Sequence, residues 1–191
     1  MKTAVFDIET SSLEAVGAGF ILCAVVTPLG GKPVVLRYDE LGCSPAKEKR
    51  LVSKLLEELN RYDILVGHNI RRFDWNYIKS RAVLFDVPIT KRPLNYDTLD
   101  AFRRCGFLTR QNSFGKPTAS LAFIADFLGI EQEKTAIYPR EHWKGVWESK
   151  PQRTVALDNL VDHCLRDVRM NEKVFYRLFE QDGGAFLRRL P

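Results

Sequence analysis

Apolar runs separated by turn residues dominate the start of the chain. Three of these runs have the length and composition of buried strands: Thr3–Ile8, Phe20–Thr27 and Pro33–Tyr38. The last two are joined by Pro28–Gly31, which is a run of turn residues. Consecutive strands with short connections predict an antiparallel meander.

Helical periodicity begins after this meander. Ser44 followed by Pro45 is typical of a helix start, and a stripe of aliphatic residues comes next: Leu51, Val52, Leu55, Leu56 and Leu59. Further along, the pattern predicts a strand at Tyr62–Val66, a helix at Phe73–Val83, a strand–helix element from Leu94 and a short helix at Ser120–Leu128.

The longest helical pattern lies near the end of the sequence. One apolar stripe runs from Leu157 to Phe179, and Gly183 and Gly184 follow it as a helix stop. A strand meander followed by alternating helices and strands predicts an α/β fold with a mixed sheet and helices on its faces. The length of 191 residues fits one domain, residues 1–191.

Composition excludes several classes of protein. A hydrophobic fraction of 45% and a charged fraction of 28% are typical of a globular chain. No stretch approaches the roughly 18 apolar residues that a membrane span needs, so we expect no membrane partner. The four cysteines are widely spaced, which excludes a zinc knuckle, and no signal peptide is visible. We therefore expect a reducing, cytoplasmic compartment.

The net charge of +5 favours an anionic partner. The excess lies between Arg61 and Ser120, where the sequence has eleven Lys and Arg residues but only five Asp residues and no Glu. A solvated surface would explain the same charges, so composition alone does not identify nucleic acid.

Two carboxylates lie near the end of the first predicted strand. Asp7 and Glu9 are two residues apart, so alternation along a strand puts them on the same face. Their mutual repulsion makes burial costly unless something neutralises it, and a divalent cation does so. Two solvated acids at a strand end are the alternative.

A second polar group follows the strand Tyr62–Val66. It includes His68 and Asn69, two arginines, and Asp74 in the first turn of the next helix. The helix dipole alone explains an acid at that position. The neighbouring Arg71 and Arg72 suggest that a phosphate binds nearby.

A third group lies on the last predicted helix. His163 and Asp167 are one turn apart, at the border of the apolar stripe. A His–Asp hydrogen bond without a catalytic role would explain this pair. Each of the three groups is weak evidence by itself, whereas their order and spacing together are specific.

Together these groups resemble the motifs of the DEDD superfamily of 3′–5′ exonucleases, which has the ribonuclease H-like fold. The three motifs are matched in order by Asp7 and Glu9, by Asn69, Phe73 and Asp74, and by His163 and Asp167. The likeness is greatest to the exonuclease domain of family B DNA polymerases, in His68–Tyr77, Tyr96–Leu99, Ser120–Gly129 and His163–Asp167. It implies a mixed five-stranded sheet with helices on both faces.

His163 stands four residues before Asp167. That is the spacing of the branch with a tyrosine, whereas the branch with a histidine has five. The resemblance therefore assigns the chain to neither branch. Because no polymerase sequence follows, we expect a stand-alone nuclease, a homo-oligomer or one subunit of a larger assembly.

The resemblance implies phosphodiester hydrolysis with two Mg²⁺ or Mn²⁺ ions. The ions would be bound by Asp7, Glu9, Asp74 and Asp167, and oxygen ligands of this kind suit Mg²⁺ or Mn²⁺ better than zinc. His163 would orient or deprotonate the attacking water, which makes it the fifth candidate catalytic residue. The candidate substrate-binding residues are Thr10, Ser11, Leu13, His68, Asn69 and Phe73.

We expect a 3′–5′ exonuclease that releases nucleoside monophosphates from single-stranded nucleic acid, with DNA favoured over RNA. Two alternatives stay open: an exoribonuclease that trims RNA 3′ ends, and a catalytically weak nucleic-acid-binding module with the same fold. A related enzyme that cuts internally, and a structural subunit whose basic face binds an acidic protein, are further alternatives.

Overall fold

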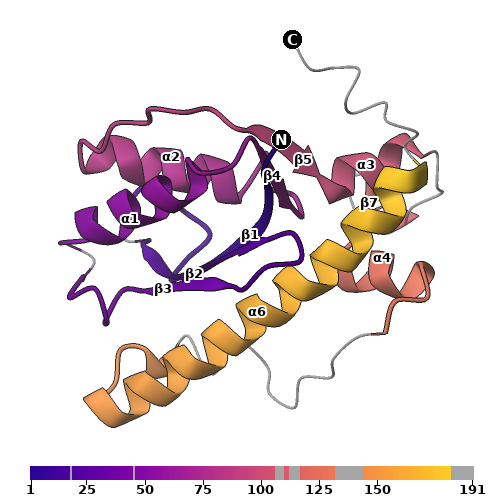
Figure 1. The fold of residues 1–191 in the computed structure, drawn as a ribbon. Helices are drawn as coiled ribbons and strands as arrows, with labels where there is room; N and C mark the ends of the chain where they lie inside the picture. The colour runs from indigo at the N-terminus through magenta and orange to yellow at the C-terminus, as the bar shows by residue number, and fades with distance from the viewer. Residues whose placement is uncertain (18, 45, 106–109, 112–116, 132–143, 182–191) are drawn as a thin grey trace.

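A mixed five-stranded sheet forms the centre of the computed structural model (Figure 1). The structure describes residues 1–17, 19–44, 46–105, 110–111, 117–131 and 144–181. The strand order is β3-β2-β1-β4-β5, with bounds β1 Thr3–Thr10, β2 Ile21–Pro28, β3 Val34–Arg37, β4 Ile64–Gly67 and β5 Leu94–Asp97. A separate two-stranded sheet pairs β6 (Arg110–Gln111) with β7 (Pro117–Thr118).

The pairing of the strands explains where the site lies. β1 pairs antiparallel with β2, and β2 with β3, which confirms the predicted meander. β4 runs parallel to β1 and β5 parallel to β4, so the sheet is mixed. The last β1–β4 pair is Val5 with Val66. The carboxyl half of β1, which carries Asp7 and Glu9, therefore extends past β4, at the edge where the parallel strands end.

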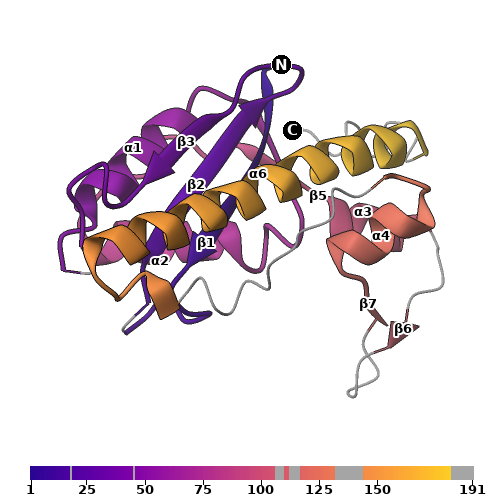
Figure 2. The same cartoon turned by 90° about the horizontal axis from the view of Figure 1, so that it is seen from below.

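Helices cover both faces of the sheet, as predicted (Figures 1 and 2). α1 (Lys49–Leu59) and α2 (Asp74–Leu84) lie on one face, and α6 (Lys150–Gln181) crosses the other. α3 (Thr98–Arg104) and α4 (Leu121–Phe127) lie beside the carboxyl-terminal part of α6. Among the described helices, none has both the length and the apolar character needed to cross a membrane.

The core explains these elements. β2 is buried over Ile21–Thr27 and β4 throughout, because helices cover both faces, and the aliphatic stripe of α1 is buried as predicted. The apolar stripe of α6 faces the sheet, although the helix begins before its first predicted residue, at Lys150. Pro45 and the predicted helix stop at Gly183 and Gly184 lie outside the described residues.

The predicted start of α1 at Ser44 is wrong. α1 begins at Lys49, and the carbonyl of Ser44 instead closes a separate turn. Glu48 precedes the helix without capping it, since its carboxylate accepts hydrogen bonds from the backbone N–H of Ile21 and from Arg81, both at 2.7 Å. A buried ion pair between Arg81 on α2 and Glu48 therefore holds the residue that precedes α1, and its carboxylate does not cap the helix.

Candidate functional site

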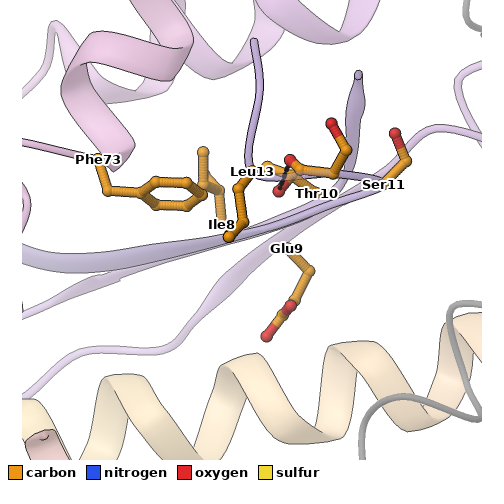
Figure 3. Close-up of a pocket in the computed structure, with 7 residues that line it drawn as sticks. Ile8, Glu9, Thr10, Ser11, Leu13 and Phe73 are labelled. Carbon is orange, nitrogen blue, oxygen red and sulfur yellow. Dashed lines mark hydrogen bonds between the residues drawn. The ribbon is translucent and has the colours of Figure 1, made fainter. Parts of the chain in front are cut away.

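The face of β1 that is directed toward α6 carries Asp7 and Glu9. Figure 3 shows the Glu9 side chain pointing to α6, while Ile8 lies on the other side of the strand. Asp7 shares the face of Glu9 by strand alternation. The thiol of Cys164 on α6 donates to the Asp7 carbonyl at 3.3 Å, so the centre of β1 and the middle of α6 are in direct contact.

α6 brings the third predicted motif to the same place. His163 Nε2 lies 3.7 Å from Glu9 Oε1 and 3.8 Å from Asp167 Oδ2. The side chains of His163 and Asp167 are 29% and 31% exposed, so solvent reaches both. The histidine therefore stands between two carboxylates that come from different elements.

α2 supplies the remaining acid at its first residue. Asp74 is buried, with 4% of its surface exposed, and its atom Oδ1 has no hydrogen-bond partner among the described residues. A buried carboxylate oxygen without a donor is costly. Burial raises the pKa of Asp74 to about 7, although hydrogen bonds from the backbone of Asp74 and Ile8 act in the opposite direction.

The four carboxyl groups repel one another. Burial raises the pKa of Asp7 well above its usual value, and the charges of Asp74, Glu9 and Asp167 raise it further. Burial also raises the pKa of Glu9, with contributions from Cys23, Asp167 and Asp74. The pKa of Asp167 is raised by burial, while His163 and Arg166 lower it. The site thus concentrates negative charge, which His163 and Arg166 offset only at Asp167 among the residues that the structure describes.

This cluster is not a finished ligand set. Within the described ranges, no group of three or more His, Cys, Asp or Glu side chains is arranged to hold a metal ion. Like charges oppose a tighter arrangement of carboxylates unless a cation neutralises them. The acids therefore repel one another electrostatically, but their oxygen atoms do not converge on one point that a metal ion could occupy.

An open pocket of about 360 Å³ has one of the four acids, Glu9, in its wall. Its walls are formed by Ile8, Glu9, Thr10, Ser11, Ser12, Leu13 and Phe73 (Figure 3). The pocket therefore brings four of the six predicted substrate-binding residues together with one of the acids. Leu13 is 85% exposed and lies within reach of solvent.

Hydrogen bonds hold the polar side of this pocket. The Thr10 hydroxyl donates to the carbonyl of Ser12 at 2.8 Å, and Ser11 Oγ accepts the backbone N–H of Phe20 at 3.0 Å. These bonds order the loop that follows β1, so the pocket is formed before any ligand binds.

The other two predicted substrate-binding residues do not line the pocket. His68 Nδ1 lies 3.2 Å from Thr98 Oγ1, and Nε2 lies 3.1 Å from the carbonyl of Ala119, which can only accept. Burial lowers the pKa of His68, so the neutral ring is favoured. Asn69 has a left-handed backbone, with φ of 59°, and begins the turn toward Asp74. Both residues therefore shape the loop between β4 and α2.

The basic residues near the site differ in how they are paired. Arg71 donates to the carbonyl of Asn95 at 2.9 Å and lies 3.7 Å from Asp100. Arg72 is exposed, and its side chain forms no hydrogen bond or ion pair with any other described residue. Arg72 directly precedes the pocket residue Phe73, so its guanidinium group is available to an anion at this edge.

Two residues in contact with the site lie in the matched segments Tyr96–Leu99 and His163–Asp167, but the sequence predicts no role in the site for either. Cys164 contacts Asp7 across nearly the whole chain, and no local pattern signals such a contact. Asp97 accepts backbone N–H groups from the β4–α2 loop and from α3. An acid just before a helix start is a capping signal, which would have identified its contact with α3 but not its contact with the loop.

The comparisons with known proteins agree with this architecture. A solved structure of the family B DNA polymerase from the hyperthermophilic archaeon Pyrobaculum calidifontis matches with a TM-score of 0.59 and 19% sequence identity. The match covers 93% of this chain but 24% of the polymerase, so it shows the fold alone. No curated protein matches the chain. A family model described as the RNase H superfamily matches residues 4–179, and the chain therefore belongs to this superfamily.

Proposed function

We propose that the chain is a metal-dependent 3′–5′ exonuclease that acts on single-stranded nucleic acid, with DNA favoured over RNA. One observation supports this most: four mutually repelling carboxylates come together from β1, α2 and α6, and one of them, Glu9, lines an open pocket with an apolar wall. Membership of the RNase H superfamily and the fold shared with a DNA polymerase agree with a nuclease.

The acids fit a divalent cation by their chemistry. All four candidate ligands, Asp7, Glu9, Asp74 and Asp167, offer carboxylate oxygens, which suit Mg²⁺ or Mn²⁺. Asp74 Oδ1 is buried and meets no donor within the described part of the chain, and the pKa of each acid is raised, so a cation would relieve an existing electrostatic cost. Two bound ions would activate a water molecule and offset the negative charge on the phosphate.

In this proposal His163 would handle the proton of the attacking water. Its Nε2 atom faces Glu9 and Asp167, and the ring is partly open to solvent. A neutral imidazole at this position would accept the proton at Nε2 or orient the water by a hydrogen bond. The neighbouring carboxylates would then stabilise the imidazolium.

The pocket fits the end of an unpaired strand. Ile8, Leu13 and Phe73 offer an apolar surface to a base, while Thr10 and Ser11 offer polar groups to the sugar and phosphate. Stacking of a base on such a surface contributes about 1–3 kcal/mol. A base in a duplex would have to leave its partner first, which favours single-stranded ends.

The central prediction concerns Asp7. With Mn²⁺, the chain should shorten 5′-labelled single-stranded DNA from its 3′ end and leave circular single-stranded DNA intact, and a chelator should stop the reaction. Asp7→Asn keeps the side-chain size but removes the charge. Turnover should fall by more than about 100-fold, because loss of a direct metal ligand should cost more than loss of a residue that only hydrogen-bonds to a ligand. The matched control is Asp126→Asn on α4, an exposed aspartate outside the site, which should retain wild-type turnover.

Other outcomes of this assay select the alternatives. Cleavage of circular DNA would refute an exonuclease, and full activity of Asp7→Asn would refute the site. Faster shortening of RNA than of DNA would identify an exoribonuclease. Binding of single strands without cleavage would identify a binding module of the same fold.

The role of His163 predicts a separate effect. At pH 8, His163→Ala should reduce turnover by about 10²–10⁴-fold, because the variant loses Nε2, the atom proposed to accept the proton of the water. Initial rates over a range of pH measure this effect. Near-wild-type turnover of His163→Ala at pH 8 would exclude a general base at this position.

Arg72 should contribute to binding of the strand through one phosphate. In a chelator, Arg72→Ala should weaken single-stranded DNA binding and reduce the slope of log K against log salt by about 0.7. The control is Arg92→Ala, which removes an exposed arginine just before β5. Arg92 lies at the amino end of β5, whereas the site lies at the carboxyl ends of the parallel β-strands. Fluorescence anisotropy at several salt concentrations measures both slopes. Equal slopes for the two variants would show that Arg72 has no specific contact.

A further inference from the structure

We infer that the β5–α3 junction, Asp97 and Thr98, positions the loop that carries Phe73 and Asp74 and joins it to α6. The catalytic consequence of this role rests on the proposed function, whereas the structural role does not. Neither side chain lines the pocket, so both are positioning residues.

The carboxylate of Asp97 joins two elements. It is buried, with 3% of the residue exposed. Its Oδ1 atom accepts the backbone N–H groups of Leu99 at 3.1 Å and Asp100 at 3.4 Å, which caps α3. The same carboxylate accepts N–H groups from the β4–α2 loop, from Asn69 at 3.0 Å and from Arg71 at 3.2 Å. One side chain therefore ends a helix and closes the loop beside it.

The loop contacts lead directly to the site. Asn69 adopts the left-handed region with φ of 59°, which asparagine tolerates better than most residues with a side chain. Its carbonyl accepts the N–H groups of Arg72 at 3.1 Å and Phe73 at 3.0 Å. The bond from the Asn69 N–H to Asp97 stabilises this turn, and the turn sets the start of α2. Loss of Asp97 should therefore displace the pocket wall at Phe73 and the acid at Asp74.

Thr98 extends the connection to α6. Its hydroxyl lies 3.2 Å from Nδ1 of His68, in the same loop, and 3.3 Å from the carbonyl of Gly67. It also lies 2.9 Å from Oδ1 of Asn171, which is buried on α6 one turn after Asp167. The junction thus links the loop that leads to Asp74 with the helix that carries Asp167.

An ordinary helix cap in the same chain provides the contrast. Ser120 caps α4 by accepting the N–H of Phe123 at 3.1 Å, within its own helix. Asp97 makes the same kind of cap but also binds a loop that lies far away in the sequence. The two caps predict different consequences when each is removed, one confined to its helix and the other reaching the site.

The test compares Asp97→Asn with Ser120→Ala. Amide hydrogen exchange, measured in a chelator, should accelerate across residues 67–75 in Asp97→Asn and stay at the wild-type rate there in Ser120→Ala. Mn²⁺ affinity, measured by calorimetry, and turnover on single-stranded DNA should each fall by about 10–100-fold in Asp97→Asn, as for outer-shell partners of metal ligands. The KM for DNA should change less than kcat, because every pocket residue except Phe73 lies on β1 or on the loop that follows it.

Unchanged exchange across residues 67–75 in Asp97→Asn would overturn the inference, as would the same acceleration in Ser120→Ala. If Asp97→Asn does not fold, Thr98→Val gives the second comparison, with faster exchange expected at Gly67 and His68 and wild-type exchange there as the contrary result. The exchange measurement needs no metal and no activity. A wild-type chain that cleaves nothing would therefore refute the proposed function, while the exchange rates would still decide the role of Asp97.

Discussion

Repulsion among carboxylates in a buried setting is the physical constraint on which this site depends. Asp7 on the central strand lies among the charges of Glu9, Asp74 and Asp167, and burial raises the pKa of each acid. An assembly of this kind opposes folding, because each ionised acid loses hydration and gains a like-charged neighbour. Groups with strongly perturbed pKa values beside a pocket are typical of functional sites.

The scaffold holds the acids in place against this repulsion. The buried β2 and β4 flank β1 and fix its position in the sheet. The Cys164 thiol joins α6 to the Asp7 carbonyl, and Asp97 closes the loop before Asp74. Each acid therefore comes from an element that is fixed by contacts other than its own. The binding energy of a cation would add to a site that is already assembled in outline.

Local patterns in the sequence predicted much of the fold. The meander, the aliphatic stripe of α1 and the long final helix each produce a periodic signal, and each is found in the structure. The strand alternation placed Asp7 and Glu9 on one face, and the helical spacing placed His163 and Asp167 at the border of a buried one. These predictions succeed because they depend on neighbours within a few residues.

The sequence does not predict the features that depend on contacts between residues far apart along the chain. The sequence predicts the start of α1 at Ser44, because the buried partners of the Glu48 carboxylate leave no local signal. These partners are Ile21 and Arg81. Likewise, nothing in the sequence near His68 shows that both ring nitrogens contact other parts of the protein. Thr10, Ser11 and Leu13 line the pocket together because they follow one another along the chain.

The stability of the chain as a function of pH, with and without Mn²⁺, tests the central claim most directly. The folded pKa of Asp74 is about 7, against 3.8 for an ordinary aspartate, so its contribution to stability is present below about pH 4 and is lost as the pH rises through 7. In a chelator, the free energy of unfolding in urea should be lower at pH 8 than at pH 5. Asp74→Asn should reduce this difference between the two pH values. For the wild type at pH 8, Mn²⁺ in place of the chelator should raise the free energy of unfolding. The same pH dependence in Asp74→Asn as in the wild type, or no effect of Mn²⁺, would contradict a cluster of carboxylates built to hold a cation.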